Sequence, residues 1–383
     1  MLPEAELLCL CAVSVLPEDR RLRLGAFARG DIDWARFSEL AVRHRVFPLA
    51  YRSLSTAAPG AVPAVLLENL RVRYYQNLTR NLAAAKELLR ILEVFAEYGL
   101  AAVTYKGPLL AESAFGGLGL RQFNDLDILI REQDLEPAVS SLESLGYRSD
   151  LPSSSWEQGR FRIYLRDFAF RRAGGPCPVE IQWRVAHRYH PLFRDQGRIW
   201  GRLRDESLAG VSLKTLSAAD ALLILCLHGL YHSWQQLQMV CDVAESIRVA
   251  DGLDWKALLA EAREQGGLRI LLLGLLLTRH LLDAALPREV LDAAAADRFI
   301  SELAAKISQG FFDRSSYLKR ARSFFFLETR LISGPWNRIR YFGGRLWTPN
   351  EQDRRVFSLP PALFVFHPFF RTVRLFKTYF LKG

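Results

Sequence analysis

Cysteine is scarce in this 383-residue chain, and its five copies lie far apart. None of them belongs to a C-x-x-C pair, so the sequence lacks the tight cysteine pairs of structural zinc sites. Five is also an odd number, which argues against a fully paired disulfide framework. This usage is typical of reduced thiols in a cytosolic protein. The cysteines are Cys9, Cys11, Cys177, Cys226 and Cys241.

Long hydrophobic runs are lacking as well. One of the longest extends from Ile270 to Leu277 and contains Gly274. It is far shorter than the roughly 20 apolar residues that a membrane-spanning helix needs. Near the N-terminus, Glu4 and Glu6 stand where a signal peptide would carry Lys or Arg. We therefore expect a cytoplasmic protein without a membrane span.

Several widespread catalytic signatures are also missing. The sequence contains no G-x-S-x-G motif, no Walker A loop and no Rossmann fingerprint. It has no low-complexity segment either. The chemistry must therefore be inferred from less common arrangements of polar residues.

Acidic residues become scarce toward the C-terminus. From Lys306 onward there are 15 Lys and Arg against four Asp and Glu, a balance of +11 in a chain of net charge +10. Such a basic, aromatic-rich region suits a polyanionic partner such as RNA. The alternative is a folded helical cap with a solvated basic face, which we favour because Phe and Leu crowd the segment. In that case these aromatic residues pack against the core: Phe324, Phe325, Phe326, Trp336 and Trp347.

Hydrophobic periodicity divides the chain into helical and mixed parts. The middle part reads strand, helix, strand, helix, strand, strand, between segments of helical period. This order predicts an α+β fold, in which a mixed-sheet core is flanked by helical regions on both sides. We expect four regions: helical residues 1–98, an α+β core at 99–205, helical residues 206–305 and the basic, aromatic-rich residues 306–383.

Capping residues predict where several helices begin. Asp33, Asp134 and Asp254 each precede an apolar periodic segment, as N-cap residues do. The sequence SAAD at 217–220 is a capping box that opens another apolar helix. A long amphipathic helix is predicted over about 66–98 and is followed by a glycine, a common helix terminator.

Two aspartates stand in the strand-like stretch "RQFNDLDILI". Side chains two apart on a strand point to the same side, with Cα atoms ~6.6 Å apart, so Asp125 and Asp127 share a face. Leu126, Ile128 and Ile130 then face the core. Like charges this close repel unless a cation lies between them, and a hard divalent ion such as Mg²⁺ suits carboxylate oxygens. The alternatives are a pair that faces water, or one aspartate that caps backbone amides.

The surrounding residues favour the metal interpretation. Lys106 and Gly107 follow a short strand and precede a helix, a position where a phosphate can be bound. Glu180 lies in the alternating strand "VEIQW", on the side opposite its apolar residues. Together with Asp125 and Asp127 it provides three carboxylates on neighbouring strands. This layout can hold two Mg²⁺ ions for phosphoryl or nucleotidyl transfer.

Other polar residues permit two interpretations each. His228 and His232 are four apart on a predicted helix, which is zinc-ligand spacing, and Cys226 and Cys241 are nearby in the sequence. We favour a packed or hydrogen-bonded histidine pair, because the Glu of H-E-x-x-H is missing. Arg121 either contacts phosphate or is an exposed structural arginine.

Taken together, these segments resemble a known family. The stretches "YKGPLLAESAF", "LRQFNDLDILIREQDLEPAVSSLESLGY" and "VEIQWRV" are similar to the polymerase-β-type nucleotidyltransferase superfamily. Within it they resemble most a bacterial group of largely uncharacterised nucleotidyltransferases, some of them linked with natural-product clusters, including lasso-peptide clusters. The segments "RHRVFPLAYRSL" and "LCLHGLYHSWQQLQMVCDVAESI" extend the resemblance over most of the chain.

The resemblance implies a role for each candidate residue. Asp125, Asp127 and Glu180 are implied to be the catalytic carboxylates and the metal ligands. Lys106 and Gly107 are implied to take the place of the Gly-Ser or Gly-Gly phosphate turn. The remaining residues implied to bind nucleotide, from the helical side or beside the aspartates, are Arg121, His228 and Asp242.

Two residues depart from the pattern of the family. Pro108 stands where many members have a second Gly or a Ser, so one backbone donor to phosphate is lost. Gln182 stands where a histidine is expected, as in E-x-H-W, which puts any proton-transfer role at that position in question.

The implied reaction is nucleotidyl transfer dependent on Mg²⁺ or Mn²⁺. A nucleoside monophosphate moves from an NTP, with ATP as the expected donor, to a hydroxyl of a small molecule, peptide or protein, and pyrophosphate is released. One alternative is a toxin-like nucleotidyltransferase that modifies tRNA, which the basic C-terminal region would suit. The other is a catalytically silent scaffold that binds nucleotide, RNA or a peptide.

Overall fold

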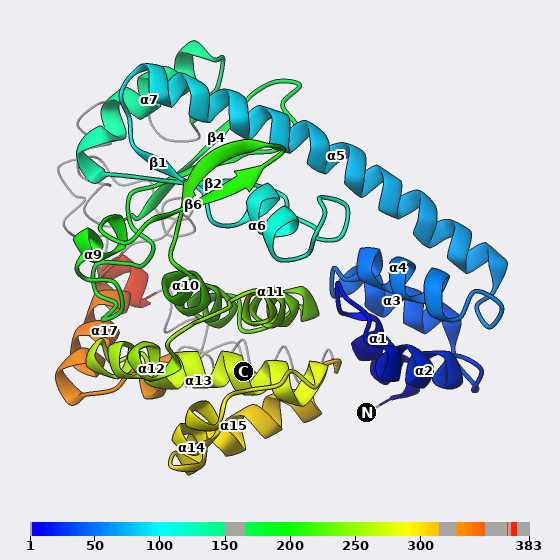
Figure 1. Cartoon of the computed structure of the whole chain (residues 1–383). Helices are drawn as coiled ribbons and strands as arrows, with labels where there is room; N and C mark the ends of the chain where they lie inside the picture. The colour runs from blue at the N-terminus through cyan, green and yellow to red at the C-terminus, as the bar shows by residue number, and fades with distance from the viewer. Residues whose placement is uncertain (1, 150–164, 314–326, 349–365, 367–368, 374–383) are drawn as a thin grey trace.

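A mixed five-stranded sheet and two groups of helices make up the computed structural model (Figure 1). The structure describes residues 2–149, 165–313, 327–348, 366 and 369–373. Four short helices gather near the N-terminus, and one long helix runs from them to the sheet, where it lies over one face. The later helices lie on the opposite side of the sheet from this long helix, and they share one hydrophobic core with the four short helices. This arrangement confirms the predicted α+β class.

The N-terminal region is helical, as predicted. Its core is formed where α1 packs against α2, α3 and α4, and α4 packs against the long helix α5. Gly99, with φ of +68°, follows the end of α5 and confirms the predicted stop. The helices are α1 (Pro3–Cys11), α2 (Glu18–Phe27), α3 (Trp34–Arg43), α4 (Phe47–Ala57) and α5 (Ala64–Glu97).

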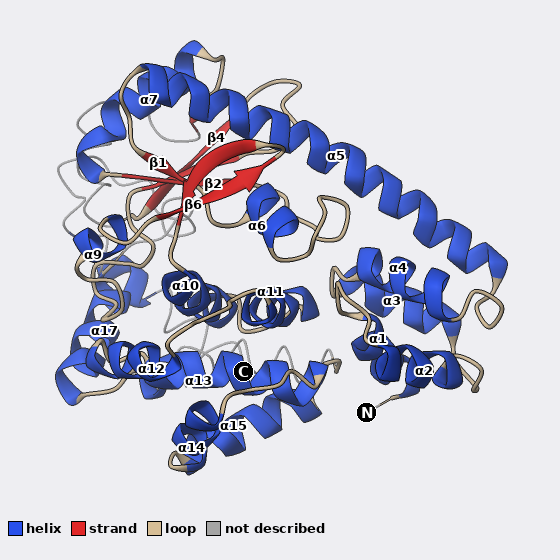
Figure 2. Cartoon of the chain, in the orientation of Figure 1, coloured by secondary structure: helices blue, strands red, loops and turns tan. Residues whose placement is uncertain are grey.

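The sheet has the strand order β1-β2-β5-β4-β3 (Figure 2). Strands β2 and β5 are parallel, and the other neighbouring pairs are antiparallel. The parallel pair is possible because a helix, α7, crosses over before the chain returns. The strands are β1 (Ala102–Val103), β2 (Leu126–Ile130), β3 (Arg148–Ser149), β4 (Asp167–Arg171) and β5 (Val179–Gln182).

One face of the sheet packs against helices α5 and α7 (Leu135–Ser144). Alternate residues of β2, namely Leu126, Ile128 and Ile130, belong to this core. The helix α6 (Gly107–Ser113) follows β1 and contacts the hairpin of β6 (Arg204–Leu208) and β7 (Val211–Thr215). The predicted alternation of β2 is therefore confirmed, and its polar positions are turned away from this core.

The helical region after the sheet is built around α13, which contacts α10, α11, α12, α14 and α15. The apolar run 270–277 lies in α13 and is fully buried, so its hydrophobicity serves the core. In the described part of the chain, no helix combines the length and the apolar character that crossing a membrane requires. The helices are α9 (Gln196–Trp200), α10 (Ala218–Tyr231), α11 (Leu237–Arg248), α12 (Trp255–Glu264), α13 (Leu268–Leu282), α14 (Arg288–Ala295), α15 (Arg298–Gln309) and α17 (Pro335–Trp347).

Three of the four predicted caps form. Asp33, Ser217 and Asp254 each accept a hydrogen bond from a backbone N–H in the first turn of their helix. Asp134 precedes α7 but makes no side-chain cap bond, so that prediction is wrong. Its backbone, at φ −89° and ψ 3°, ends a short 3₁₀ turn, whereas a capping side chain needs an extended N-cap residue.

The prediction that the C-terminal aromatic residues pack against the core is wrong for the two tryptophans that the structure describes. Trp336 and Trp347 of α17 are 80% and 63% exposed. Tyr341 is the buried aromatic residue of this helix, because it lies on the opposite face of α17. The predicted residues 324–326 lie outside the described part of the chain.

Candidate active site

All eight predicted site residues line one polar pocket of about 460 Å³. The sheet and the turn before α6 provide one wall, and the segments around α10 and α11 provide the other. The structure therefore brings together residues that are up to 136 positions apart, from Lys106 to Asp242. The predicted residues are Lys106, Gly107, Arg121, Asp125, Asp127, Glu180, His228 and Asp242.

The parallel pairing of β2 and β5 sets two of the carboxylates side by side. Asp127 and Glu180 are direct register partners, and Asp125 immediately precedes β2. Both strands bury their alternate residues on the other face, which leaves the carboxylates on the pocket side. The predicted shared face of the two aspartates is confirmed.

Asp127 is held by two neighbours. The ammonium group of Lys106 lies 3.4 Å from its carboxylate oxygens. The amide of Gln182 donates a hydrogen bond of 2.5 Å to Oδ1 of Asp127, and Oε1 of Gln182 accepts one of 2.5 Å from the hydroxyl of Tyr105. Gln182, the departure from the family pattern, therefore serves as a donor that orients Asp127.

Asp125 and Glu180 have no hydrogen-bond or ion-pair partner among the described residues. Burial, followed by the charge of Asp127, raises the pKa of Asp125. Burial, followed by the charges of Asp127, Asp167 and Asp125, raises the pKa of Glu180 to about 7. Both shifts have the same two causes, burial first and the neighbouring carboxylates second, and a bound cation would favour the charged form of both groups.

The donor set fits a hard divalent cation in its chemistry, because carboxylate oxygens are what Mg²⁺ and Mn²⁺ prefer. As the described side chains are placed, however, no three His, Cys, Asp or Glu residues are arranged to hold a metal ion. The carboxylate of Asp127 faces Lys106 and Gln182. An ion that uses Asp127 must therefore compete with the Lys106 ammonium.

Lys106 and Gly107 occupy the start of α6, as predicted. Gly107 has φ of +54°, which strains any residue with a Cβ, and a Cβ there would lie 3.6 Å from the carbonyl oxygen of Asp125. Lys106 is buried, and burial alone would lower its pKa, but Asp127 and then Tyr105 raise it above the ordinary value. The turn therefore offers the pocket a permanently charged ammonium group and a backbone without a side chain.

His228 of α10 and His232, which directly follows that helix, pack against each other, with ring centroids 4.5 Å apart. Burial, and then the charge of Lys106, lowers the pKa of both, to about 4 for His232. Cys226 and Cys241 face the carbonyl oxygens of Leu271 and Ala12 in the core. The arrangement supports a packed pair of neutral imidazoles rather than a zinc site.

Arg121 and Asp242 form a buried bidentate ion pair, with distances of 2.7 and 2.9 Å. The alternative of an exposed structural arginine is therefore wrong. Both carboxylate oxygens of Asp242 are used by Arg121, so Asp242 acts on the pocket through that guanidinium. Within the part of the chain that the structure describes, Nη1 of Arg121 is buried without a hydrogen-bond partner.

Three further charged residues line the pocket and were missed from the sequence. Arg166 and Asp167 form an ion pair of 3.1 Å, and β4 brings them beside β5, where Asp167 is the register partner of Gln182. No local pattern in the sequence indicates that the strand containing Asp167 neighbours β5. Arg45 enters from the turn between α3 and α4. It lies in a segment that carried the family resemblance, without a motif of its own.

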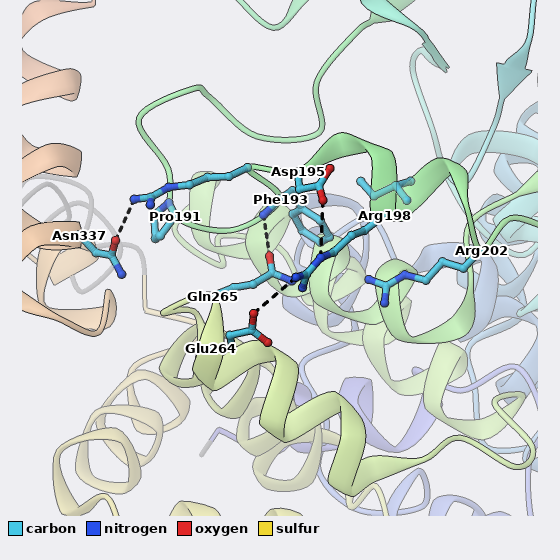
Figure 3. Close-up of a pocket in the computed structure, with 10 residues that line it drawn as sticks. Pro191, Phe193, Asp195, Arg198, Arg202, Glu264, Gln265 and Asn337 are labelled. Atoms are coloured by element: carbon cyan, nitrogen blue, oxygen red, sulfur yellow. Dashed lines mark hydrogen bonds and ion pairs between the residues drawn. The ribbon is translucent and has the colours of Figure 1, made fainter.

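A second, smaller pocket of about 190 Å³ lies between the segment before α9 and the helices α12 and α17 (Figure 3). Arg198 pairs with the carboxylates of Asp195 and Glu264, and Arg194 donates a hydrogen bond to the amide oxygen of Asn337. We interpret this pocket as a polar seam between packed elements, because these polar groups bind one another across it.

Comparisons with known proteins show the family to which the chain belongs. The model of a family described as uncharacterised nucleotidyltransferase matches residues 30–283. A solution structure of the antibiotic-resistance factor ANT(2'')-Ia is 12% identical, with a TM-score of 0.35, over 48% of this chain and 94% of that chain. No curated protein matches the chain.

Proposed function

Because the chain belongs to the uncharacterised nucleotidyltransferase family, we propose that it moves a nucleoside monophosphate from an NTP to an acceptor hydroxyl and releases pyrophosphate. Transfer of a nucleotidyl group follows from the family. The proposal adds Mg²⁺ or Mn²⁺ as the cofactor, ATP as the expected donor, and a small molecule, peptide or protein as the acceptor.

The observation that carries the proposal is the pair of uncompensated carboxylates, Asp125 and Glu180, beside Asp127 in one pocket. These three residues would hold the divalent ion. When bound, the ion would neutralise phosphate charge and make the acceptor hydroxyl more acidic. The positions of the carboxylates on rigid strands suit a reaction in which positioning and electrostatics dominate.

The other residues of the pocket have roles that follow from their charge. Once a metal ion binds the carboxylate of Asp127, the ammonium group of Lys106 can pair with a phosphate instead. Gly107 lets the backbone approach the phosphates closely, since it has no side chain in the way. A carboxylate oxygen of Glu180 is a suitable acceptor for the proton of the attacking hydroxyl.

We expect Asp125→Asn to abolish metal-dependent transfer without unfolding the protein. Asp125 has no hydrogen-bond or ion-pair partner in the described part of the chain, so its replacement removes a partly buried charge and should leave the melting temperature unchanged or raise it. The variant Asp127→Asn is less useful, because breaking a buried ion pair with Lys106 costs about 3–5 kcal/mol. The measurement is incorporation of labelled nucleotide by mass spectrometry, with Mg²⁺, labelled NTPs and cell extract as the source of acceptor.

The matched control is Asp205→Asn, since Asp205 is an exposed aspartate of β6 that pairs with Lys214. Its incorporation should equal that of the wild type. Incorporation at the wild-type rate by a folded Asp125→Asn protein would show that the carboxylate proposal is wrong.

A further inference from the structure

Arg45 is the basic side chain of the pocket that has no ion-pair partner among the described residues, although the charge of Asp125 acts on it from a longer distance. The other three basic residues each have a carboxylate partner: Lys106 pairs with Asp127, Arg121 with Asp242 and Arg166 with Asp167. Among the described residues, the Arg45 side chain makes no hydrogen bond or ion pair. A guanidinium group that is partly buried and unpaired costs free energy, so its retention needs a reason.

The pocket residues without an ion-pair partner carry charges of both signs. Three charged groups of the pocket take part in none of these ion pairs: the carboxylates of Asp125 and Glu180 and the guanidinium of Arg45. The carboxylates attract a cation, and the guanidinium of Arg45 attracts an anion. A complex of a divalent ion with a nucleoside triphosphate supplies both charges at once.

The backbone holds Arg45 in a defined place. Its φ of +60° is left-handed, a conformation that costs a residue with a Cβ roughly 1–2 kcal/mol. The preceding residue, His44, is anchored to the start of α11: its Nδ1 accepts from the N–H of Leu237 at 3.2 Å, and its carbonyl accepts from Gln238 at 3.1 Å. These bonds fix the turn that presents Arg45, so its position is determined by tertiary contacts.

A second donor lies in the same pocket. Two nitrogens of Arg121 donate to Asp242, and its Nη1 is buried without a hydrogen-bond partner among the described residues. Asp242 cancels the charge of Arg121, but Nη1 can still donate hydrogen bonds. Arg45 therefore supplies the charge and Arg121 an oriented N–H group, a combination that suits phosphate oxygens.

We propose that Arg45 and Nη1 of Arg121 form an oxyanion position that binds the phosphates of the metal-bound nucleoside triphosphate. This inference rests on the proposed function, because it assumes that a nucleotide enters this pocket. It assigns the N-terminal helical region a direct part in substrate binding. Arg45 is then a binding residue, which the family resemblance does not imply.

The test is the affinity of the full-length protein for ATP and for tripolyphosphate, each with Mg²⁺, measured by calorimetry. Asn tolerates the left-handed conformation, so Arg45→Asn should fold at least as well as the wild type. We expect it to bind both ligands at least ~10-fold more weakly, equivalent to ~1.4 kcal/mol. Arg45→Lys, which keeps the charge, should recover part of the loss, and Arg36→Asn on exposed α3 should change neither affinity.

The outcomes separate this inference from the proposed function. If the wild type binds ATP and Arg45→Asn binds both ligands equally well, the oxyanion position is refuted and the proposed function stands. A loss for ATP alone would also refute it, because it would place Arg45 against the sugar or the base. If the wild type binds neither ligand, the proposed function itself is contradicted.

Discussion

At the scale of single residues, the chain of contacts around Asp127 explains how a charged site is kept inside the protein. Lys106 compensates the carboxylate, Gln182 donates to it, and Tyr105 donates to Gln182. All four side chains are buried. Buried polar groups of this kind are stable only when each is satisfied, and here each partner satisfies the next.

Gln182 is accordingly expected to act as a positioning residue. Gln182→Leu removes the donor to Asp127 and leaves the Tyr105 hydroxyl without its acceptor. Loss of a residue that orients a metal-binding carboxylate typically lowers metal affinity or activity by about 10–100-fold. The readout is the Mg²⁺ concentration that gives half-maximal nucleotide incorporation, which should rise.

Gln182→His is the matched variant, since an imidazole N–H can replace the amide donor. It should keep most of the activity at the wild-type Mg²⁺ requirement. An unchanged Mg²⁺ requirement in Gln182→Leu would show that this hydrogen bond does not position Asp127.

At the scale of elements, α17 shows how one helix divides its aromatic residues. Tyr341 is buried and donates from its hydroxyl to Glu328, and its ring lies 5.4–5.5 Å from those of His190 and Tyr189. Trp336 points to solvent from the same helix. The described part of the C-terminal region is therefore attached to the core through Tyr341.

We expect Tyr341→Ala to lower the free energy of unfolding by about 3–5 kcal/mol, as for other large-to-small changes at buried aromatic residues. The change also removes one hydrogen-bond partner of the buried Glu328. Trp336→Ala, in the same helix, should change stability by less than ~0.5 kcal/mol because its side chain is exposed. Chemical denaturation of both variants measures the difference, and equal effects would contradict the assigned helix face.

At the scale of the whole molecule, the pocket has walls from three regions that are tied together by buried polar contacts. The Arg121–Asp242 pair joins the segment before β2 to α11. Glu245 of α11 accepts hydrogen bonds of 2.7 and 2.6 Å from the backbone and side chain of Ser14. Arg248, in the same helix, donates to the carbonyl of Ala114 after α6. Helix α11 is thus the common support of the site.

The pocket does not explain why the C-terminal region is basic. If residues 306–383 bound RNA, the affinity would fall steeply with salt, because each phosphate contact releases counterions. We favour a folded cap, since residues 327–347 contain buried Leu331, Ile332 and Tyr341. We therefore expect no salt-dependent RNA binding that relies on this region.

Electrophoretic mobility of tRNA with a fourfold charge-reversal variant tests this expectation. The reversed residues are Arg320, Arg322, Arg354 and Arg355, which lie outside the described part of the chain. The wild type and the variant should behave alike. A salt-sensitive shift that disappears in the variant would instead favour tRNA as the acceptor.

Local physics explains what could be predicted from the sequence. A period of two placed Asp125 and Asp127 on one side of a strand, and a period of 3.6 located the helices on both sides of the sheet. Asp33, Ser217 and Asp254 cap the helices they precede, since a cap depends on a few neighbouring residues. The family resemblance then implied that residues from separate segments belong to one site.

Only the tertiary structure decided which charges compensate one another. Lys106 pairs with Asp127, 21 residues away, and Arg121 with Asp242, 121 residues away. Asp167 approaches Glu180 because β4 and β5 are neighbours, and Arg45 enters the pocket because His44 is bound to α11. No local pattern encodes such contacts, since pairing energies depend on distance and burial in space, and both arise only when the whole chain has folded.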